Sequence, residues 1–207
     1  RILFAFSYLS EIEWLDGRGY NTLGVYVPAC YSGSEREYPG ELNLVLWENM
    51  ADPIITGREE LGIAKVYCEL PPPRVQESTA TCTASWDGHG FAGLELTDLA
   101  DASPEPAVLL EDSAGLLHHK YIPCTGEWGK ADVSYPVLTP AAAPNSRVIW
   151  RKTGMGSCRF VESTWEQLPT LVHIVNALAA IELGRCLFAE MFEVRGYKDI
   201  SDQHRLT

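Results

Sequence analysis

The amino-acid sequence predicts an α+β fold that consists mostly of antiparallel β-sheet. Many short runs of β-branched and aromatic residues are separated by turn residues, a pattern typical of strands joined by hairpins. Only two stretches carry helix signals, one after residue 50 and one after residue 163. The 207 residues contain no repeat and no low-complexity segment, so we expect one domain over 1–207. The chain begins inside a strand-like run, which indicates that an N-terminal segment is missing.

The first third of the chain predicts three strands, a short helix and a fourth strand. The strands cover 2–9, 21–31 and 42–47, and Pro28 indicates an edge or a bulge in the second. Loops are expected at 11–19 and 32–39. Asp52 is a good helix N-cap and Pro53 suits the first helical position, so a helix is expected from there to about Gly62. The fourth strand runs from Lys65 to Leu70 and ends at three prolines.

The rest of the chain predicts a hairpin, further strands and one longer helix. Asp87-Gly88 is a turn signal between strands at 78–86 and 91–96. Thr164 and Gln167 have the spacing of a capping box, and apolar residues follow at helical spacing as far as Ile181. Gly184 fits the end of that helix. Four more strands are expected at 116–122, 132–138, 147–150 and 187–194, with loops at 100–106 and 139–146.

Charge and cysteine content exclude several classes of function. A formal net charge of −12 argues against nucleic acid or an anionic membrane as partner. No apolar run approaches the ~20 residues of a membrane-spanning helix. The six cysteines form no Cys-x-x-Cys pair, so we expect free thiols, a cytoplasmic location and no metal site.

Lys65 is the candidate for chemistry. It stands among apolar residues, Leu61, Ile63, Ala64 and Val66. Burial disfavours the charged form of a lysine and lowers its pKa, and a neutral amine can attack a ketone to form a Schiff base. The alternative interpretation is an exposed lysine near the end of a helix, where a cation is mildly favourable.

Two motifs around this lysine resemble a known family. Gly57-Arg58-Glu59, followed by five residues and Lys65, resembles the signature of the acetoacetate decarboxylase superfamily. The segments 20–28 and 40–54 are also similar to the family's strands and motif entry. The resemblance places Lys65 at the position of the Schiff-base lysine, and it implies a curled sheet that forms a partly closed, cone-like barrel. It also implies a homo-oligomer and a reaction without an external cofactor.

The chain departs from the family pattern at two positions. Val66 replaces a second lysine, and Thr22 replaces a glutamate. Glu59 matches the family motif and Glu60 lies five residues before Lys65, so both are candidates for proton transfer beside the lysine. The alternative is a solvated face or a structural pair with Arg58, since charged helix residues are mostly exposed.

Four other residues are candidates for contact with the substrate. They are Arg58, Thr22, Trp47 and Tyr20. Aromatic residues in strands are core residues by default, so this role is weighed against simple packing for Trp47 and Tyr20.

Other motifs carry little signal. His118 and His119 are adjacent in a predicted strand, so at most one of them faces inward, and no third ligand has metal spacing. Gly154-Met155-Gly156 lacks the strand–helix context of a nucleotide site. A Gly-x-Ser-x-Gly motif and a Walker motif are absent.

The sequence therefore predicts a Schiff-base-forming lyase that decarboxylates a small-molecule keto acid. The same enamine from a pyruvate-type acid could instead attack an aldehyde and lose water, which makes an aldolase/dehydratase the main alternative. A third hypothesis is a non-catalytic binding protein that retains the fold without the chemistry.

Overall fold

A computed structural model describes residues 1–34, 36–104, 113–140, 146–196 and 202–207. The helices are α1 Ala51–Thr56 and α2 Val172–Ala179, with a 3-10 turn at Glu13–Leu15 and a π-helical turn, η2, at Gly57–Leu61. The strands are β1 Leu3–Tyr8, β2 Asn21–Ser32, β3 Glu37–Glu48, β4 Lys65–Tyr67, β5 Arg74–Gln76, β6 Thr79–Trp86, β7 His89–Asp101, β8 Gly115–Pro123, β9 Ala131–Pro140, β10 Arg147–Phe160, β11 Ala189–Arg195 and β12 His204–Arg205. The strand-rich α+β class is as predicted.

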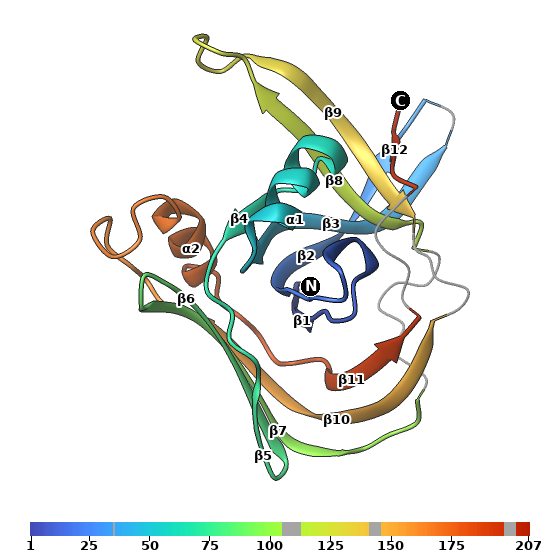
Figure 1. Cartoon of the computed structure of the whole chain (residues 1–207), viewed down its shortest axis with the longest axis vertical. Coiled ribbons are helices and arrows are strands. Elements are labelled where there is room, and N and C mark those ends of the chain that lie inside the picture. The colour runs from blue at the N-terminus through green and yellow to red at the C-terminus, as the bar shows by residue number, and fades with distance from the viewer. Residues whose placement is uncertain (35, 105–112, 141–145, 197–201) are drawn as a thin grey trace.

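The strands form two sheets (Figure 1). The first has the order β1-β2-β3-β8-β9-β12, with β4 paired to β3, and the second has the order β11-β10-β7-β6-β5. Among the described strands, β3 pairs in parallel with β4 and with β8, and the other pairs are antiparallel. Neither strand order closes on itself within the described residues, so the partly closed, cone-like barrel stays a prediction.

The main hydrophobic core joins both sheets and α2. Its side chains come from β2, β3, β6, β7, α2 and the segments next to them: Leu23, Val25, Val45, Trp47, Cys68, Leu70, Ala84, Phe91, Ala92, Leu168, Leu171 and Val175. Both faces of β3 are covered near its end, because Val45, Leu46, Trp47 and Glu48 are all buried. The period-two alternation expected over 42–47 therefore does not describe this end of the strand. A bulge in the β2–β3 pairing also leaves Leu44 exposed.

The first predicted helix is divided into two parts. It begins at Ala51, and the extended Met50 is the N-cap, so the prediction that Asp52 caps this helix was wrong. The chain remains extended only as far as Met50, which leaves Asp52 and Pro53 inside the first turn. The following turn, η2, is π-helical and ends at Leu61, and its C-cap is Gly62, whose φ of 82° is accessible to glycine at little cost.

The second predicted helix is shorter than its sequence pattern. Gln167 accepts a hydrogen bond from the Thr164 amide, as in a capping box, but the chain makes turns until Leu171 and α2 covers only Val172–Ala179. Pro169 is the physical reason, since it has no N–H to donate and restricts the backbone of Leu168.

The β6–β7 hairpin forms as predicted, and β10 is longer than predicted. In the β6–β7 hairpin, Asp87 and Gly88 have φ values of 48° and 78°, as a type I′ turn requires. The strand predicted over 147–150 continues to Phe160, because β10 pairs with β7 on one side and β11 on the other. Gly156 permits this, since a Cβ there would lie 2.7 Å from the Cβ of Ala189.

The remaining predicted segments need smaller corrections. The strand expected over 65–70 ends at Tyr67 as β4, and beyond it Glu69 forms an isolated bridge with Ser85. The loop expected over 100–106 begins after β7 ends at Asp101. Residues 105–106 and 141–145 of the two predicted loops lie outside the described residues. No helix in the described part of the chain is long and apolar enough to cross a membrane.

Candidate active site

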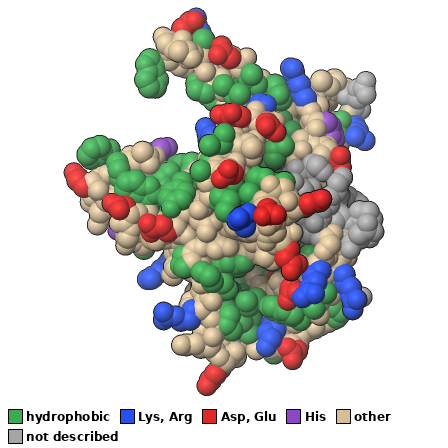
Figure 2. Space-filling model, viewed as in Figure 1, with side chains coloured by type: hydrophobic (Ala, Val, Ile, Leu, Met, Phe, Trp, Pro, Cys, Tyr) green, Lys and Arg blue, Asp and Glu red, His purple; other side chains and the backbone are tan. Residues whose placement is uncertain are grey.

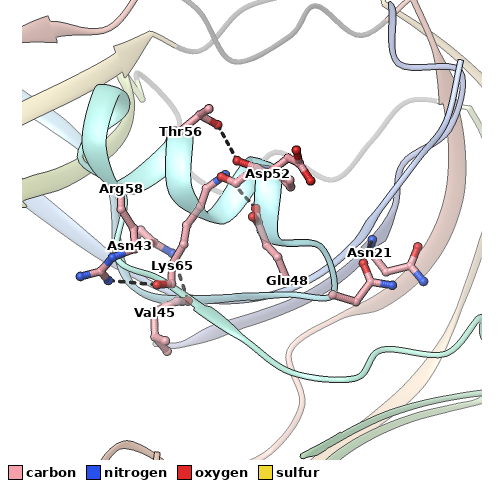
Figure 3. Close-up of polar contacts among 10 residues, drawn as sticks. Asn21, Asn43, Val45, Glu48, Asp52, Thr56, Arg58 and Lys65 are labelled. Carbon is pink, nitrogen blue, oxygen red and sulfur yellow. Dashed lines mark hydrogen bonds and ion pairs between the residues drawn. The ribbon is translucent and has the colours of Figure 1, made fainter. Parts of the chain in front are cut away.

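Lys65 is buried at the start of β4 and faces a buried carboxylate. Its side chain is 3% exposed, and its Nζ lies 2.8 Å from Oε1 of Glu48, which is 1% exposed (Figure 3). Nζ also donates a hydrogen bond of 3.0 Å to the carbonyl oxygen of Pro53 in α1. The amine is therefore held between the end of β3 and the first turn of α1.

Strand register explains why these two side chains meet. Lys65 pairs with Leu46 in the parallel β3–β4 ladder, and Glu48 lies two residues beyond Leu46 on the same face of β3. Trp47 points to the opposite face, into the main core, where its ring packs on Phe91 and Phe160. One strand thus supplies a core anchor and a carboxylate from adjacent residues.

The π-helical turn closes over Lys65. The amide of Ile63 donates to the carbonyl oxygen of Gly57 at 3.0 Å, which folds the chain back toward β4. Gly57 lies against the lysine side chain so closely that a Cβ there would be 2.6 Å from Nζ. The glycine of the Gly-Arg-Glu motif therefore has a packing reason, because only a residue without a side chain leaves room for the amine.

The other charged residues of the motif lie at the surface. Arg58 is exposed, and its guanidinium donates to the backbone carbonyl oxygen of Lys65 at 3.0 Å, which ties η2 to β4. Glu59 and Glu60 are exposed on η2, and the carbonyl oxygen of Glu60 accepts a hydrogen bond from Lys120. The structure brings Arg58 to the backbone of Lys65, and the carboxylate in contact with the amine is that of Glu48.

Thr22 and Tyr20 are both buried near the site. Thr22 pairs with Glu48 in the antiparallel β2–β3 ladder, so the two side chains share one face. Asn21, between them, donates a hydrogen bond from its side-chain amide to the backbone carbonyl oxygen of Leu70. Its backbone carbonyl oxygen accepts a hydrogen bond from the backbone N–H of Asn49. This network fixes the ends of β2 and β3 next to Glu48.

Glu48 is poorly solvated for a carboxylate. Burial raises the pKa of the Glu48 carboxyl above its usual range, and the charge and hydrogen bond of Lys65 oppose that rise. Its second oxygen, Oε2, is buried and has no hydrogen-bond partner among the described residues. Burying an unsatisfied carboxylate oxygen is costly, so this oxygen is available to a proton or to a donor on a bound molecule.

Sequence reasoning missed Glu48. In the sequence it is one acidic residue at the end of an apolar run, and it is separated from Lys65 by sixteen residues. The usable signal was its position, since a carboxylate two residues beyond Leu46 belongs to the same strand face. The parallel pairing that places Lys65 beside Leu46 could not be read from the sequence.

His118 is the inward histidine of its pair, and His119 is exposed, as the strand pattern predicted. The ring of His118 contacts the Gly62 carbonyl oxygen at 3.1 Å and the Thr139 hydroxyl at 2.9 Å. Burial lowers the pKa of His118, so this ring supports the end of η2 as a neutral group. No cluster of three or more metal-ligating side chains occurs among the described residues.

One family model matches most of the chain. The model of the acetoacetate decarboxylase (ADC) family matches residues 1–190, well beyond the segments between Tyr20 and Lys65 that carry the resemblance. No curated protein matches the chain.

Three solved structures have similar folds. An acetoacetate decarboxylase from Legionella pneumophila is 18% identical with a TM-score of 0.67, covering 93% of this chain and 69% of that one. A second acetoacetate decarboxylase is 13% identical with a TM-score of 0.70, covering 99% and 72%. The enduracididine biosynthesis enzyme MppR, complexed with pyruvate, is 14% identical with a TM-score of 0.59, covering 91% and 70%.

Proposed function

The chain belongs to the acetoacetate decarboxylase family, and we propose that it is a Schiff-base-forming lyase that acts on a keto acid. The observation that carries this proposal is the buried amine of Lys65, held between Glu48 and the Pro53 carbonyl oxygen. A lysine withdrawn from water is costly to keep, and such groups concentrate at functional sites.

The proposed reaction uses the lysine as an electron sink. The amine of Lys65 adds to the ketone carbon, and loss of water gives an iminium. The bond to a β-carboxylate then breaks, its electron pair moves toward the iminium nitrogen, and carbon dioxide leaves. The resulting enamine takes a proton on carbon, and hydrolysis of the new iminium releases the ketone and the amine. Each step uses the protein, water and substrate, with no external cofactor.

An aldolase/dehydratase is the second candidate. MppR, one of the similar folds, is described in complex with pyruvate and with the condensation product of pyruvate and imidazole 4-carboxaldehyde. The residue at position 22 of this chain is a threonine rather than the glutamate expected from the decarboxylases. An enamine formed at Lys65 from a pyruvate-type acid could attack an aldehyde by the same initial steps.

The third candidate is a non-catalytic binding protein. The observation that favours it is the ion pair itself, because a carboxylate 2.8 Å from Nζ can hold the amine as an unreactive ammonium. In each proposal the ligand is a small keto acid, and Arg58, Thr22 and Tyr20 remain the proposed contacts. The packing of Trp47 in the main core, on the face of β3 opposite Lys65, favours the alternative of simple packing for that residue. Glu59 and Glu60, exposed on η2, remain proposed proton carriers.

Borohydride trapping separates the candidates. The full chain is incubated with acetoacetate or pyruvate, reduced, and weighed intact, and the modified peptide is then sequenced by mass. We expect one adduct, on Lys65. Release of carbon dioxide from acetoacetate supports the decarboxylase, whereas a condensed product from pyruvate and an aldehyde supports the alternative. Absence of an adduct with either acid would leave the binding protein as the function.

A further inference from the structure

We propose that Glu48 is the proton-transfer residue for Lys65. Its carboxylate takes a proton from the amine before the amine attacks the ketone, and it then delivers protons to the ketone oxygen, which leaves as water. This inference rests on the proposed Schiff-base chemistry and assigns the residue that operates it. Among the described residues, the carboxylate within ion-pair distance of the reacting nitrogen is that of Glu48.

The hydrogen-bond geometry suits a neutral amine. Nζ has two acceptors among the described residues, Glu48 Oε1 at 2.8 Å and the Pro53 carbonyl oxygen at 3.0 Å. A neutral amine has two N–H groups and a lone pair, whereas an ammonium has three N–H groups. Two acceptors therefore satisfy the amine completely and leave its lone pair available to a ketone.

Moving the proton from Nζ to Glu48 changes no net charge. The ion pair becomes a neutral amine beside a neutral carboxylic acid, and both groups are almost fully withdrawn from water. Burial disfavours the charged pair relative to the neutral one, since the desolvation of two charges can exceed their attraction. The raised pKa of Glu48 also favours the neutral pair, because this carboxyl binds a proton more readily than an exposed glutamate does.

The complete sequence of transfers balances. The amine nitrogen forms a bond to the ketone carbon while the C=O electron pair moves to oxygen, which receives the proton held by Glu48. The carboxylate then takes a second proton from nitrogen and gives it to the carbinolamine hydroxyl, and the C–O bond breaks to release water. Two protons have moved from nitrogen to oxygen, the iminium retains one, and Glu48 is again a carboxylate facing a cation.

The free oxygen of Glu48 provides the second contact that this sequence needs. Oε1 faces Nζ, and Oε2 is buried without a partner among the described residues. A carbinolamine places a hydroxyl one carbon away from the nitrogen, so one carboxylate can bridge both atoms. Thr22, directly across from Glu48 in the β2–β3 ladder, carries no charge that would compete.

The other charged groups around Glu48 are less able to take this role. Asp52 of α1 and Arg58, Glu59 and Glu60 of η2 are exposed. Tyr67, paired with Glu48 on β4, is half exposed, and His118, which supports η2 from β8, is buried with a lowered pKa. Lys65 is the charged group that acts on the pKa of Glu48.

The test measures the rate of adduct formation on Lys65 with acetoacetate and with pyruvate. Glu48→Gln keeps the shape of the side chain but cannot exchange a proton, and Glu95→Gln, an exposed position on β7, is the matched control. We expect Glu48→Gln to slow adduct formation by about 10²–10⁴-fold, the usual contribution of general acid–base catalysis. We expect the control to keep the parent rate, and circular dichroism to show both variants folded.

An equal or faster rate in folded Glu48→Gln would overturn the proposal, and a faster one would mean that Glu48 restrains the amine as an ammonium. A loss in Glu60→Gln or Glu59→Gln, without a loss in Glu48→Gln, would transfer the role to η2. If the parent itself forms no adduct, the proposed function has failed; if the parent reacts and Glu48→Gln reacts equally, only the present inference has failed.

A pH profile of the parent decides the matter even if Glu48→Gln does not fold. The amine can be released only while Glu48 is able to accept its proton. The parent rate should be level near neutral pH and fall as the pH drops through the pKa of Glu48, which lies above the usual value of about 4.3. A rate that instead rises steadily through neutral pH, as for an isolated protonated amine, would overturn the proposal.

Discussion

The packing of Gly57 on Lys65 makes Gly57→Ala an informative substitution. Gly57 has φ −64° and ψ −36°, ordinary helical values, so local preference alone predicts that alanine stabilises the turn by about 0.5–1 kcal/mol. A Cβ at this position would lie 2.6 Å from Nζ and 2.5 Å from Cδ of Lys65. The sign of the effect is therefore decided by tertiary packing and not by helix propensity.

The magnitude follows from the displacement of the lysine. Overpacking a filled site costs about 1–3 kcal/mol, and breaking a buried ion pair costs about 3–5 kcal/mol. If Lys65 moves and partly loses Glu48, the net destabilisation, after the helical gain, should be about 2–4 kcal/mol. Adduct formation should fall as well, because Nζ leaves the position that Glu48 and Pro53 define.

Urea unfolding and borohydride trapping measure the two effects separately. Gly90→Ala is the control, since a Cβ at Gly90 would meet nothing within 4 Å. We expect that control to retain the parent's trapping rate and nearly its unfolding free energy. If Gly57→Ala is as stable as the parent or more so, and traps keto acids at the same rate, then the proposed packing of Lys65 against Gly57 is refuted.

Three further predictions concern the nucleophile, the thiols and assembly. Lys65→Arg should abolish trapping in a folded protein, because arginine keeps the charge and cannot form an iminium; a remaining adduct would assign the nucleophile to another lysine. All six cysteines are free, so denatured protein should titrate as six thiols. In native protein at pH 8 the exposed Cys30 and Cys186 should react first, whereas burial raises the pKa of Cys68 and keeps it protonated; rapid labelling of Cys68 would contradict this. Light scattering at micromolar concentration should show a homo-oligomer, since large apolar side chains such as Trp128 are exposed and apolar groups line the projecting β8–β9 hairpin (Figure 2), whereas a monomer would count against it.

Local sequence determined most of the strands and the positions of turns and helix ends. Asp87-Gly88 specified a type I′ hairpin because both residues accept positive φ, and Gly62 specified the end of the first helical segment for the same reason. The Gly-Arg-Glu…Lys spacing was sufficient to select Lys65 and to indicate the family. These features depend on residues close together in the chain, where geometry follows directly from residue type.

Tertiary structure decided the surroundings of the lysine. The parallel β3–β4 pairing brings Glu48 to Nζ across sixteen intervening residues, and no local pattern encodes which strands pair or in which register. Trp47 faces the core from the other side of β3, and Glu59 and Glu60 lie at the surface on η2. The sequence could therefore select Lys65 as the proposed nucleophile, but the carboxylate in contact with it depended on burial and strand pairing, which exist only in the folded chain.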